Sequence, residues 1–292
     1  MRIFVTGASG WIGSAVVPEL QAAGHEVIGL ARSDEAAKTI ANSGAEVVRG
    51  ELADLDLLRA TAASSDGVVH LGYVHDFSRM PEAAATDRAA IETFGAALAG
   101  SGAPLLIASG VLGLARGRAA TEQDDPDPAV HPRVGNAQLT LSFAAQDVRP
   151  IVVRFAPTVH GAGDHGFVAR LVEIARERGT SGYVGDGANR WPAVHRQDAA
   201  RLVRLAVDAA PAGSVLHAVA EEGVPTHAIA EAIGRGLDLP VAPAAPEEFG
   251  WLGAFFAADC PTSSAITQQR LDWSPEHPGL VADLDAGHYF AR

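Results

Sequence analysis

Short apolar runs alternate along the chain with longer segments in which apolar residues recur at helical spacing. Such runs are typical of strands covered on both faces, and such segments are typical of helices. This alternation predicts an α/β protein built on a doubly wound parallel sheet. The expected strands are residues 2–6, 25–30, 46–49, 67–71, 104–108, 151–155 and 214–219. The expected helices are residues 11–23, 82–100, 139–146, 167–178 and 197–209.

A glycine-rich turn joins the first expected strand to the first expected helix. Its glycines follow the spacing T-G-x-x-G-x-x-G. In this context the first glycine permits a tight turn, the second lets a pyrophosphate approach the backbone, and the third lets the helix pack on the strand. The N-terminus of the helix would then hold the phosphates. We expect cofactor contacts from Gly7, Ser9, Gly10, Trp11, Ile12 and Gly13.

The pattern changes after residue 155. Two glycine-rich segments, 156–167 and 179–195, flank the expected helix at 167–178, and the remainder of the chain is rich in proline. A polar, acidic segment at 116–133 reads as a surface loop. We therefore predict a Rossmann-type domain at 1–157, to which 195–222 return. The expected small C-terminal substrate-binding cap comprises 158–194 and 223–292.

Composition excludes several classes of partner. The chain has 292 residues, 48% of them hydrophobic, and a net charge of −13 without a basic run. We therefore expect a small-molecule substrate and neither nucleic acid nor membrane. The lone Cys260 excludes an intrachain disulfide and reads as a packed small hydrophobe. No apolar stretch has membrane-spanning length, and the start lacks a charged leader, so we expect a cytoplasmic protein.

The end of the second strand bears on cofactor choice. Arg32 offers a planar cation and Ser33 a hydroxyl for a 2′-phosphate, which favours NADP(H) over NAD(H). In the alternative reading Arg32 is a solvated surface charge and Asp34 binds the ribose diol of NAD.

Further motifs occur in a fixed order along nearly the whole chain. Together with the glycine turn they resemble the extended short-chain dehydrogenase/reductases, close to the NAD-dependent epimerase/dehydratase-like proteins. The matching segments are TGASGWIG at 6–13, GELAD at 50–54, VHLG at 69–72, IASG at 107–110, VRFAPTVHG at 153–161, AVHRQDAARLV at 193–203 and LDWSP at 271–275.

The resemblance implies further cofactor contacts. GELAD is similar to a segment that contacts adenine, VHLG to a loop beside the cofactor ribose, and VRFAPTVHG to a stretch beside the nicotinamide. It also implies that a homodimer can form through the helices at 82–100 and 138–146. The additional residues expected at the cofactor are Glu51, Leu52, Leu71, Gly72 and Pro157.

The resemblance fails at the family's catalytic Tyr-x-x-x-Lys pair. The segment in that place is PRVGNAQL, with Arg133 at the tyrosine position and Ala137 at the lysine position. Arginine stays protonated far above neutral pH and cannot act as a poised acid. Asp87 lies near the place of a family asparagine. The chain therefore resembles the atypical members.

Three residues are candidates for catalysis. Ser109 matches the family's catalytic serine position, Tyr73 follows the fourth strand, and His160 replaces an aromatic residue of the family. Each also has a plain structural interpretation: Ser109 as a strand cap, Tyr73 as a rim aromatic, and His160 as a histidine bonded to backbone. A metal site at His160, Asp164 and His165 lacks a recognised spacing, so we expect none.

The second glycine-rich segment carries the expected substrate contacts. Its aromatic residues suit an apolar or cyclic substrate, whereas Arg190 suits an anionic one. Trp191 has an alternative role in sealing the cap. The expected substrate residues are Arg133, Tyr183, Trp191 and His195.

These features predict an NAD(P)H-dependent oxidoreductase that reduces a small carbonyl or imine-like compound. An iminium accepts hydride without an acid, which agrees with the missing tyrosine. One alternative is a dinucleotide-binding sensor or regulatory protein of weak catalytic power. The other is a sugar-nucleotide epimerase or dehydratase.

Overall fold

The computed structural model describes residues 1–74, 79–128 and 132–291. The chain divides into two compact units. The first unit comprises Met1–Ser109, Asp125–Arg154 and Ala200–Leu216. The second unit comprises Gly110–Asp124, Phe155–Ala199 and His217–Arg292.

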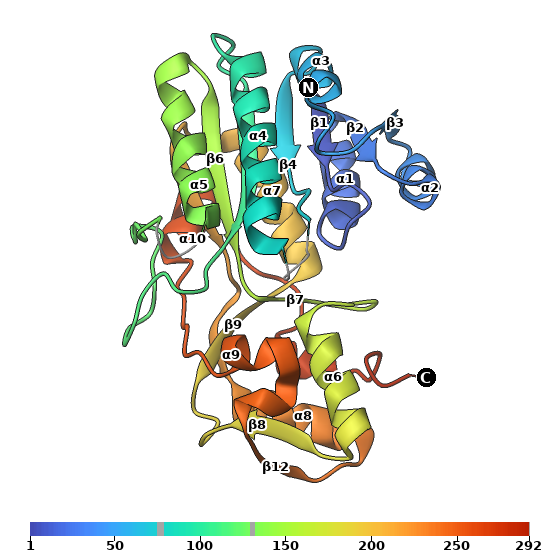
Figure 1. Cartoon of the computed structure of the whole chain (residues 1–292), viewed down its shortest axis with the longest axis vertical. Helices are drawn as coiled ribbons and strands as arrows, with labels where there is room; N and C mark the ends of the chain where they lie inside the picture. The colour runs from blue at the N-terminus through green and yellow to red at the C-terminus, as the bar shows by residue number, and fades with distance from the viewer. Residues whose placement is uncertain (75–78, 129–131, 292) are drawn as a thin grey trace. The chain divides into compact units, whose positions relative to one another are not determined.

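The strands and helices follow one another along the chain as Figure 1 shows by colour. The strands are β1 (Arg2–Thr6), β2 (Glu26–Ala31), β3 (Glu46–Arg49), β4 (Gly67–His70), β5 (Pro104–Gly110), β6 (Arg149–Phe155), β7 (Thr158–His160), β8 (Ser181–Val184), β9 (Arg190–His195), β10 (Ser214–Ala218), β11 (Glu221–Pro225) and β12 (Val241–Ala244). The α-helices are α1 (Gly13–Ala22), α2 (Asp34–Asn42), α3 (Leu55–Ala63), α4 (Met80–Leu98), α5 (Pro132–Ser142), α6 (Phe167–Arg178), α7 (Arg196–Ala209), α8 (Thr226–Leu237), α9 (Gly253–Phe256), α10 (Ala265–Leu271) and α11 (Leu280–Asp285). Two 3₁₀ helices are η2 (Phe143–Gln146) and η3 (Pro246–Leu252).

The main sheet has seven strands in the order β10-β6-β5-β4-β1-β2-β3. Strand β1 pairs in parallel with β2 on one side and with β4 on the other. The strand order therefore reverses between β1 and β4, and ligands of such sheets bind outside the carboxyl ends of the strands at this point. The predicted doubly wound α/β sheet is confirmed.

Helices α3, α4 and α5 pack side by side on one face of this sheet (Figure 1). The core between them and the strands is apolar and fully buried, with Phe4, Leu58, Ile91, Phe94 and Leu105 among its members. Burial of these side chains stabilises the sheet and fixes the helices that carry the candidate site.

The second unit has its own apolar core and two small sheets. The three-stranded sheet has the order β11-β9-β7, and the two-stranded sheet pairs β12 with β8. Trp191, Phe249, Leu252, Phe256 and Leu280 are buried in this core. None of these five short strands is among the strands expected from the sequence. Each of these strands is only three to six residues long, so its pattern is too brief to distinguish from a loop.

No helix among the described residues combines the length and the apolar character that crossing a membrane requires.

Candidate functional site

The glycine turn after β1 forms a tight cradle. Gly7 has a φ of +69°, which favours glycine, and a Cβ there would lie 2.7 Å from the Gly72 nitrogen. A Cβ at Gly13 would overlap the carbonyl oxygen of Gly7. The Gly10 amide donates to that same oxygen at 2.9 Å, so the turn folds back on itself before α1 begins.

This cradle fits the diphosphate of a dinucleotide. Side chains at Gly7 and Gly13 would displace the turn, because their Cβ atoms would meet backbone atoms of Gly72 and of Gly7 respectively. The positive end of α1 attracts an anion. Leu71 and Gly72, which follow β4, lie directly against Gly7.

The ends of β2 and β3 form a polar edge. Arg32 is exposed, while the Ser33 hydroxyl accepts the Ala36 amide at 3.2 Å and caps the N-terminus of α2. The Arg49 guanidinium donates to the Ser33 carbonyl and is ion-paired with the Asp34 carboxylate. Sequence reasoning missed Arg49. This residue ends β3, the strand next to β2, and it pairs with Ala31, the last residue of β2.

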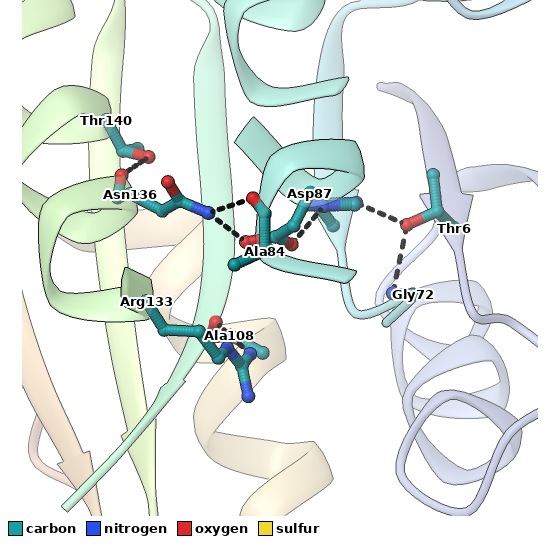
Figure 2. A network of polar contacts seen from close by, with 9 residues as sticks. Thr6, Gly72, Ala84, Asp87, Ala108, Arg133, Asn136 and Thr140 are labelled. Carbon is teal, nitrogen blue, oxygen red and sulfur yellow. Dashed lines mark hydrogen bonds and ion pairs between the residues drawn. The ribbon is translucent and has the colours of Figure 1, made fainter. Parts of the chain in front are cut away.

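A buried polar network runs from β1 through α4 to α5 (Figure 2). Thr6 Oγ1 accepts the Gly72 amide at 3.1 Å and contacts His70 Nδ1 at 2.7 Å. His70 Nε2 lies 3.0 Å from Asp87 Oδ1, and the Asn136 amide donates to Asp87 Oδ2 at 2.6 Å. Asp87 therefore holds the segment after β4 with one carboxylate oxygen and α5 with the other.

The hydrogen-bond partners define the protonation of this network. Burial opposes ionisation of Asp87, but the hydrogen bond and charge of His70, together with Arg133 and Asn136, hold its pKa below the ordinary value. Asp87 Oδ1 shares a hydrogen bond with His70 Nε2, and His70 Nδ1 shares a second one with the Thr6 hydroxyl. Figure 2 shows Asn136 also donating to the Ala84 carbonyl, at 3.1 Å.

Tyr73, Arg133 and the end of β5 lie together in the first unit. The Arg133 guanidinium carbon lies 4.3 Å from the centroid of the Tyr73 ring, and its Nη2 donates to the Ala108 carbonyl at 2.8 Å. Ser109 follows Ala108 and is half-exposed. The three polar residues expected here, Tyr73, Ser109 and Arg133, are thus brought to one end of the sheet.

The two positions of the family's catalytic pair have different surroundings. Arg133 lies near the N-terminus of α5, and its side chain reaches the end of β5. Ala137 is buried in the core of the first unit. Asn136, between them, is buried and bound to Asp87. Sequence reasoning missed His70 and Asn136. They lie within the segments VHLG and PRVGNAQL, but the resemblance assigns no role to either residue.

His160 belongs to the second unit and is completely buried. Its Nδ1 lies 2.9 Å from Asp283 Oδ2. Burial opposes ionisation of Asp283, but the hydrogen bond and charge of His160 hold the pKa of that carboxyl below its ordinary value. The Asp164 carboxylate accepts hydrogen bonds from the Gly166 amide and from the Tyr289 hydroxyl. Both of its oxygens therefore stabilise the local structure.

The expected substrate residues of the second glycine-rich segment have varied surroundings. Trp191 is buried and its indole donates to the Phe255 carbonyl at 3.1 Å. Tyr183 is half-buried, with its ring edge-on to His227. Arg190 forms two hydrogen bonds to Asp259, at 3.0 and 2.9 Å, so its cation is neutralised locally.

Three potential metal ligands gather near the end of β9. Single ligand atoms of His195, Asp198 and His277 lie within 4.8 Å of one another. The His195 and His277 rings are stacked at 4.6 Å with an interplanar angle of 6°. Their nitrogen lone pairs therefore lie in two separate, nearly parallel planes, which is unfavourable for binding one ion between them. Asp198 is buried and bonded to His277 Nδ1 and to the amides of Glu276 and His277.

Cys260 is buried and is not a reactive thiol. Burial raises its pKa to about 12, and the nearby Asp259 carboxylate adds to this rise. The thiol therefore stays protonated at neutral pH.

Comparison with known proteins finds a matching family and several relatives. Residues 3–99 match the NAD dependent epimerase/dehydratase family. An uncharacterised protein of Schizosaccharomyces pombe, C2A9.02, is 48% identical over 99% of this chain and 100% of its own length. The 4-hydroxy-2-methyl-3-oxo-4-farnesyl-3,4-dihydroquinoline-1-oxide ketoreductase of Stigmatella aurantiaca is 29% identical over 74% of this chain and 67% of its own.

A solved structure supports the same fold. DesIV, the dTDP-glucose 4,6-dehydratase of Streptomyces venezuelae, was solved with NAD bound. It superposes with a TM-score of 0.78 at 20% identity, over 99% of this chain and 96% of that chain.

Proposed function

Because the chain belongs to the NAD-dependent epimerase/dehydratase family, we propose that it is an NAD(P)H-dependent reductase of a small carbonyl or imine-like compound. The observation that carries this proposal is the glycine turn itself: Gly7 and Gly13 have no room for a side chain, and Gly10, where a diphosphate would approach, lies between them. A relative named as a ketoreductase supports reduction of a carbonyl. Bound in the cradle, the dinucleotide supplies the hydride.

The edge formed by β2 and β3 supports NADP(H) in preference to NAD(H). Arg32 is exposed there, and Arg49 brings a second guanidinium to the same edge. Asp34, which would bind the ribose diol of NAD, is ion-paired with Arg49. The exposed Arg32 cation favours a 2′-phosphate, while Arg49 engages the carboxylate that a ribose diol would need.

Residues near the ends of β4 and β5 would bind and orient the substrate. The half-exposed Ser109 can donate its hydroxyl proton to a carbonyl oxygen or an imine nitrogen. Arg133 fixes the backbone before Ser109 through the Ala108 carbonyl. Holding the reacting atoms in line is the chain's main contribution to such a transfer.

The surroundings of the second glycine-rich segment favour an uncharged substrate over a sugar nucleotide. Arg190, the cation that would suit an anionic substrate, is bound to Asp259 through two hydrogen bonds. Tyr183 and His195 remain half-buried and can line a site for a cyclic or apolar compound.

A dinucleotide-binding sensor is the second candidate. The observation that favours it is the replacement of both members of the usual pair, with Ala137 buried in the core. A sensor would bind the dinucleotide tightly and oxidise none of it.

Binding and turnover separate these candidates. NADPH and NADH should first be titrated against the chain, and NADPH oxidation should then be followed at 340 nm with panels of ketones and cyclic imines. We expect tighter binding of NADPH and measurable oxidation in at least one panel. Tight binding with no oxidation in either panel would support the sensor instead.

Substitutions at the polar edge test cofactor choice. Arg32→Ala should weaken NADPH binding about tenfold, because a bidentate cation is lost, and leave NADH binding unchanged. Arg49→Ala should free the Asp34 carboxylate for a ribose diol, and so reduce the difference in affinity between NADPH and NADH. Arg59→Ala, an exposed arginine paired within α3, is the matched control. Equal effects on both dinucleotides would refute the assignment.

A further inference from the structure

Tyr73 lies at the edge of the sheet where a dinucleotide would bind. It follows Gly72, whose backbone nitrogen would be 2.7 Å from a Cβ on Gly7, and whose amide donates to Thr6. The strand order reverses between β1 and β4, so Gly7 and Gly72 are both at the reversal point. The Tyr73 phenol therefore extends from the segment that contacts the cradle.

Arg133 holds its positive charge against the face of this phenol. The guanidinium carbon is 4.3 Å from the ring centroid, and the bond from Nη2 to the Ala108 carbonyl fixes the group in that position. A cation over the ring stabilises the phenolate more than the phenol. Arg133 cannot donate a proton itself near neutral pH, so it acts through the ring.

The phenol is protonated at neutral pH. Burial raises the pKa of Tyr73 above its ordinary value, Arg133 opposes this rise, and Asp87 adds to it. A protonated phenol can donate. The phenolate left after donation carries a charge that the facing guanidinium stabilises.

One carboxylate positions both members of the pair. Asp87 Oδ1 bonds to His70, which reaches the Gly72 amide through Thr6. Asp87 Oδ2 bonds to Asn136, one helical turn after Arg133 on α5. The distance between Arg133 and the Tyr73 ring is therefore fixed through buried groups on four different elements, β1, β4, α4 and α5.

Resting on the proposed function, we propose that Tyr73 is the proton donor of the reduction and that Arg133 is its positioning residue. In this step hydride adds to the carbonyl carbon and the C=O π electrons move to oxygen. The Tyr73 O–H bond breaks and its proton passes to that oxygen, giving the alcohol. The dinucleotide is oxidised, and the phenolate beneath Arg133 regains a proton from water.

The test pairs two substrates that differ in their need for a proton. In the Tyr73→Phe variant, ketone reduction should fall at least 100-fold, whereas reduction of a preformed iminium should stay within about threefold. Wild-type chain that reduces neither substrate would refute the proposed function. Wild-type chain that reduces the ketone, with Tyr73→Phe equally fast, would refute only the assignment of Tyr73. Equal loss with both substrates would show that Tyr73 serves binding and not proton transfer.

A second readout requires neither cofactor nor turnover. The chain contains three tyrosines, so ¹³C-tyrosine spectra can follow each phenol against pH, with Tyr73→Phe assigning one signal. Arg133→Gln should raise the pKa of the Tyr73 phenol, and Arg133→Lys should restore part of the difference. Arg88→Gln, which removes an exposed guanidinium from α4, should leave it unchanged. An unchanged Tyr73 titration in Arg133→Gln would refute the role of Arg133.

Discussion

At Gly13, the start of α1 lies so close to the turn after β1 that there is no room for a side chain. The carbonyl oxygen of Gly7 occupies the position where a Cβ of Gly13 would be. Any side chain must therefore displace the N-terminus of α1 or the turn before it. Because the same turn offers its backbone to a diphosphate, the displacement should affect binding more than folding.

Gly13→Ala should weaken NADPH binding at least tenfold and lower the free energy of unfolding by about 1–3 kcal/mol, the usual effect of overpacking. Titration of intrinsic fluorescence measures the first effect, and urea unfolding measures the second. Gly135→Ala is the matched control, because among the described residues its Cβ would meet only the Pro128 Cβ, at 3.8 Å. Unchanged NADPH affinity in Gly13→Ala would contradict the cradle.

For single residues, the sequence predicts the place of a residue in the fold better than the residues that it contacts. The spacing of Gly7, Gly10 and Gly13 was sufficient to place the turn, because backbone geometry there depends on local residue type. The pairs Asp87–Asn136 and Asp34–Arg49 join residues 49 and 15 positions apart. Only the completed sheet and helix packing bring such residues together, so no local pattern identifies them.

Helices α4 and α5 are joined by apolar packing and by the Asp87 carboxylate. Ala137 of α5 and Phe94 of α4 share the buried core, and Asn136 bonds to Asp87 beside it. A buried carboxylate is stable only when its bonds are satisfied, as they are here. The network therefore orients the two helices more specifically than apolar contacts alone.

Asp87→Asn should lower the free energy of unfolding by about 1–3 kcal/mol, because an amide nitrogen replaces one acceptor and leaves a buried donor unmatched. The folded pKa of Asp87 is lowered, so its contribution is present above the unfolded value of about 3.9 and is lost as pH falls toward the folded value. The stability difference between wild type and variant should accordingly shrink below about pH 4.

Asp56→Asn, on the exposed side of α3, should change stability little at any pH. Urea unfolding from pH 3 to pH 8 measures both variants. A constant difference between wild type and Asp87→Asn over that range would contradict an ionised Asp87.

Several predicted elements have the bounds that the sequence pattern gives. The strand at 46–49 and the helix at 167–178 are two of them. The helix expected at 139–146 begins instead at Pro132 as α5 and continues as η2. Its start contains Gly135 and Asn136, whose weak helix propensity hides this part of the helix from the pattern. Packing against α4 overrides that propensity.

The polar groups of the candidate sites are divided between two units, each with its own apolar core. The first unit contains the glycine cradle, Tyr73, Ser109 and Arg133. The second unit contains His160, which was expected to be a candidate acid, and buries it against Asp283. The sequence could not distinguish these two surroundings, because a histidine in a glycine-rich loop is compatible with either. The proposed proton transfer therefore rests on groups of the first unit.

The most direct measurement is isotope transfer from NADPH carrying two deuterium atoms at C4 of the nicotinamide. The chain should be incubated with the ketone and iminium panels, and the products analysed by mass spectrometry. The proposed function predicts one deuterium in each product molecule for each NADPH consumed, with Gly13→Ala much slower at the same NADPH concentration. NADPH consumption without deuterium in any product, or no consumption with either panel, would contradict the proposed function.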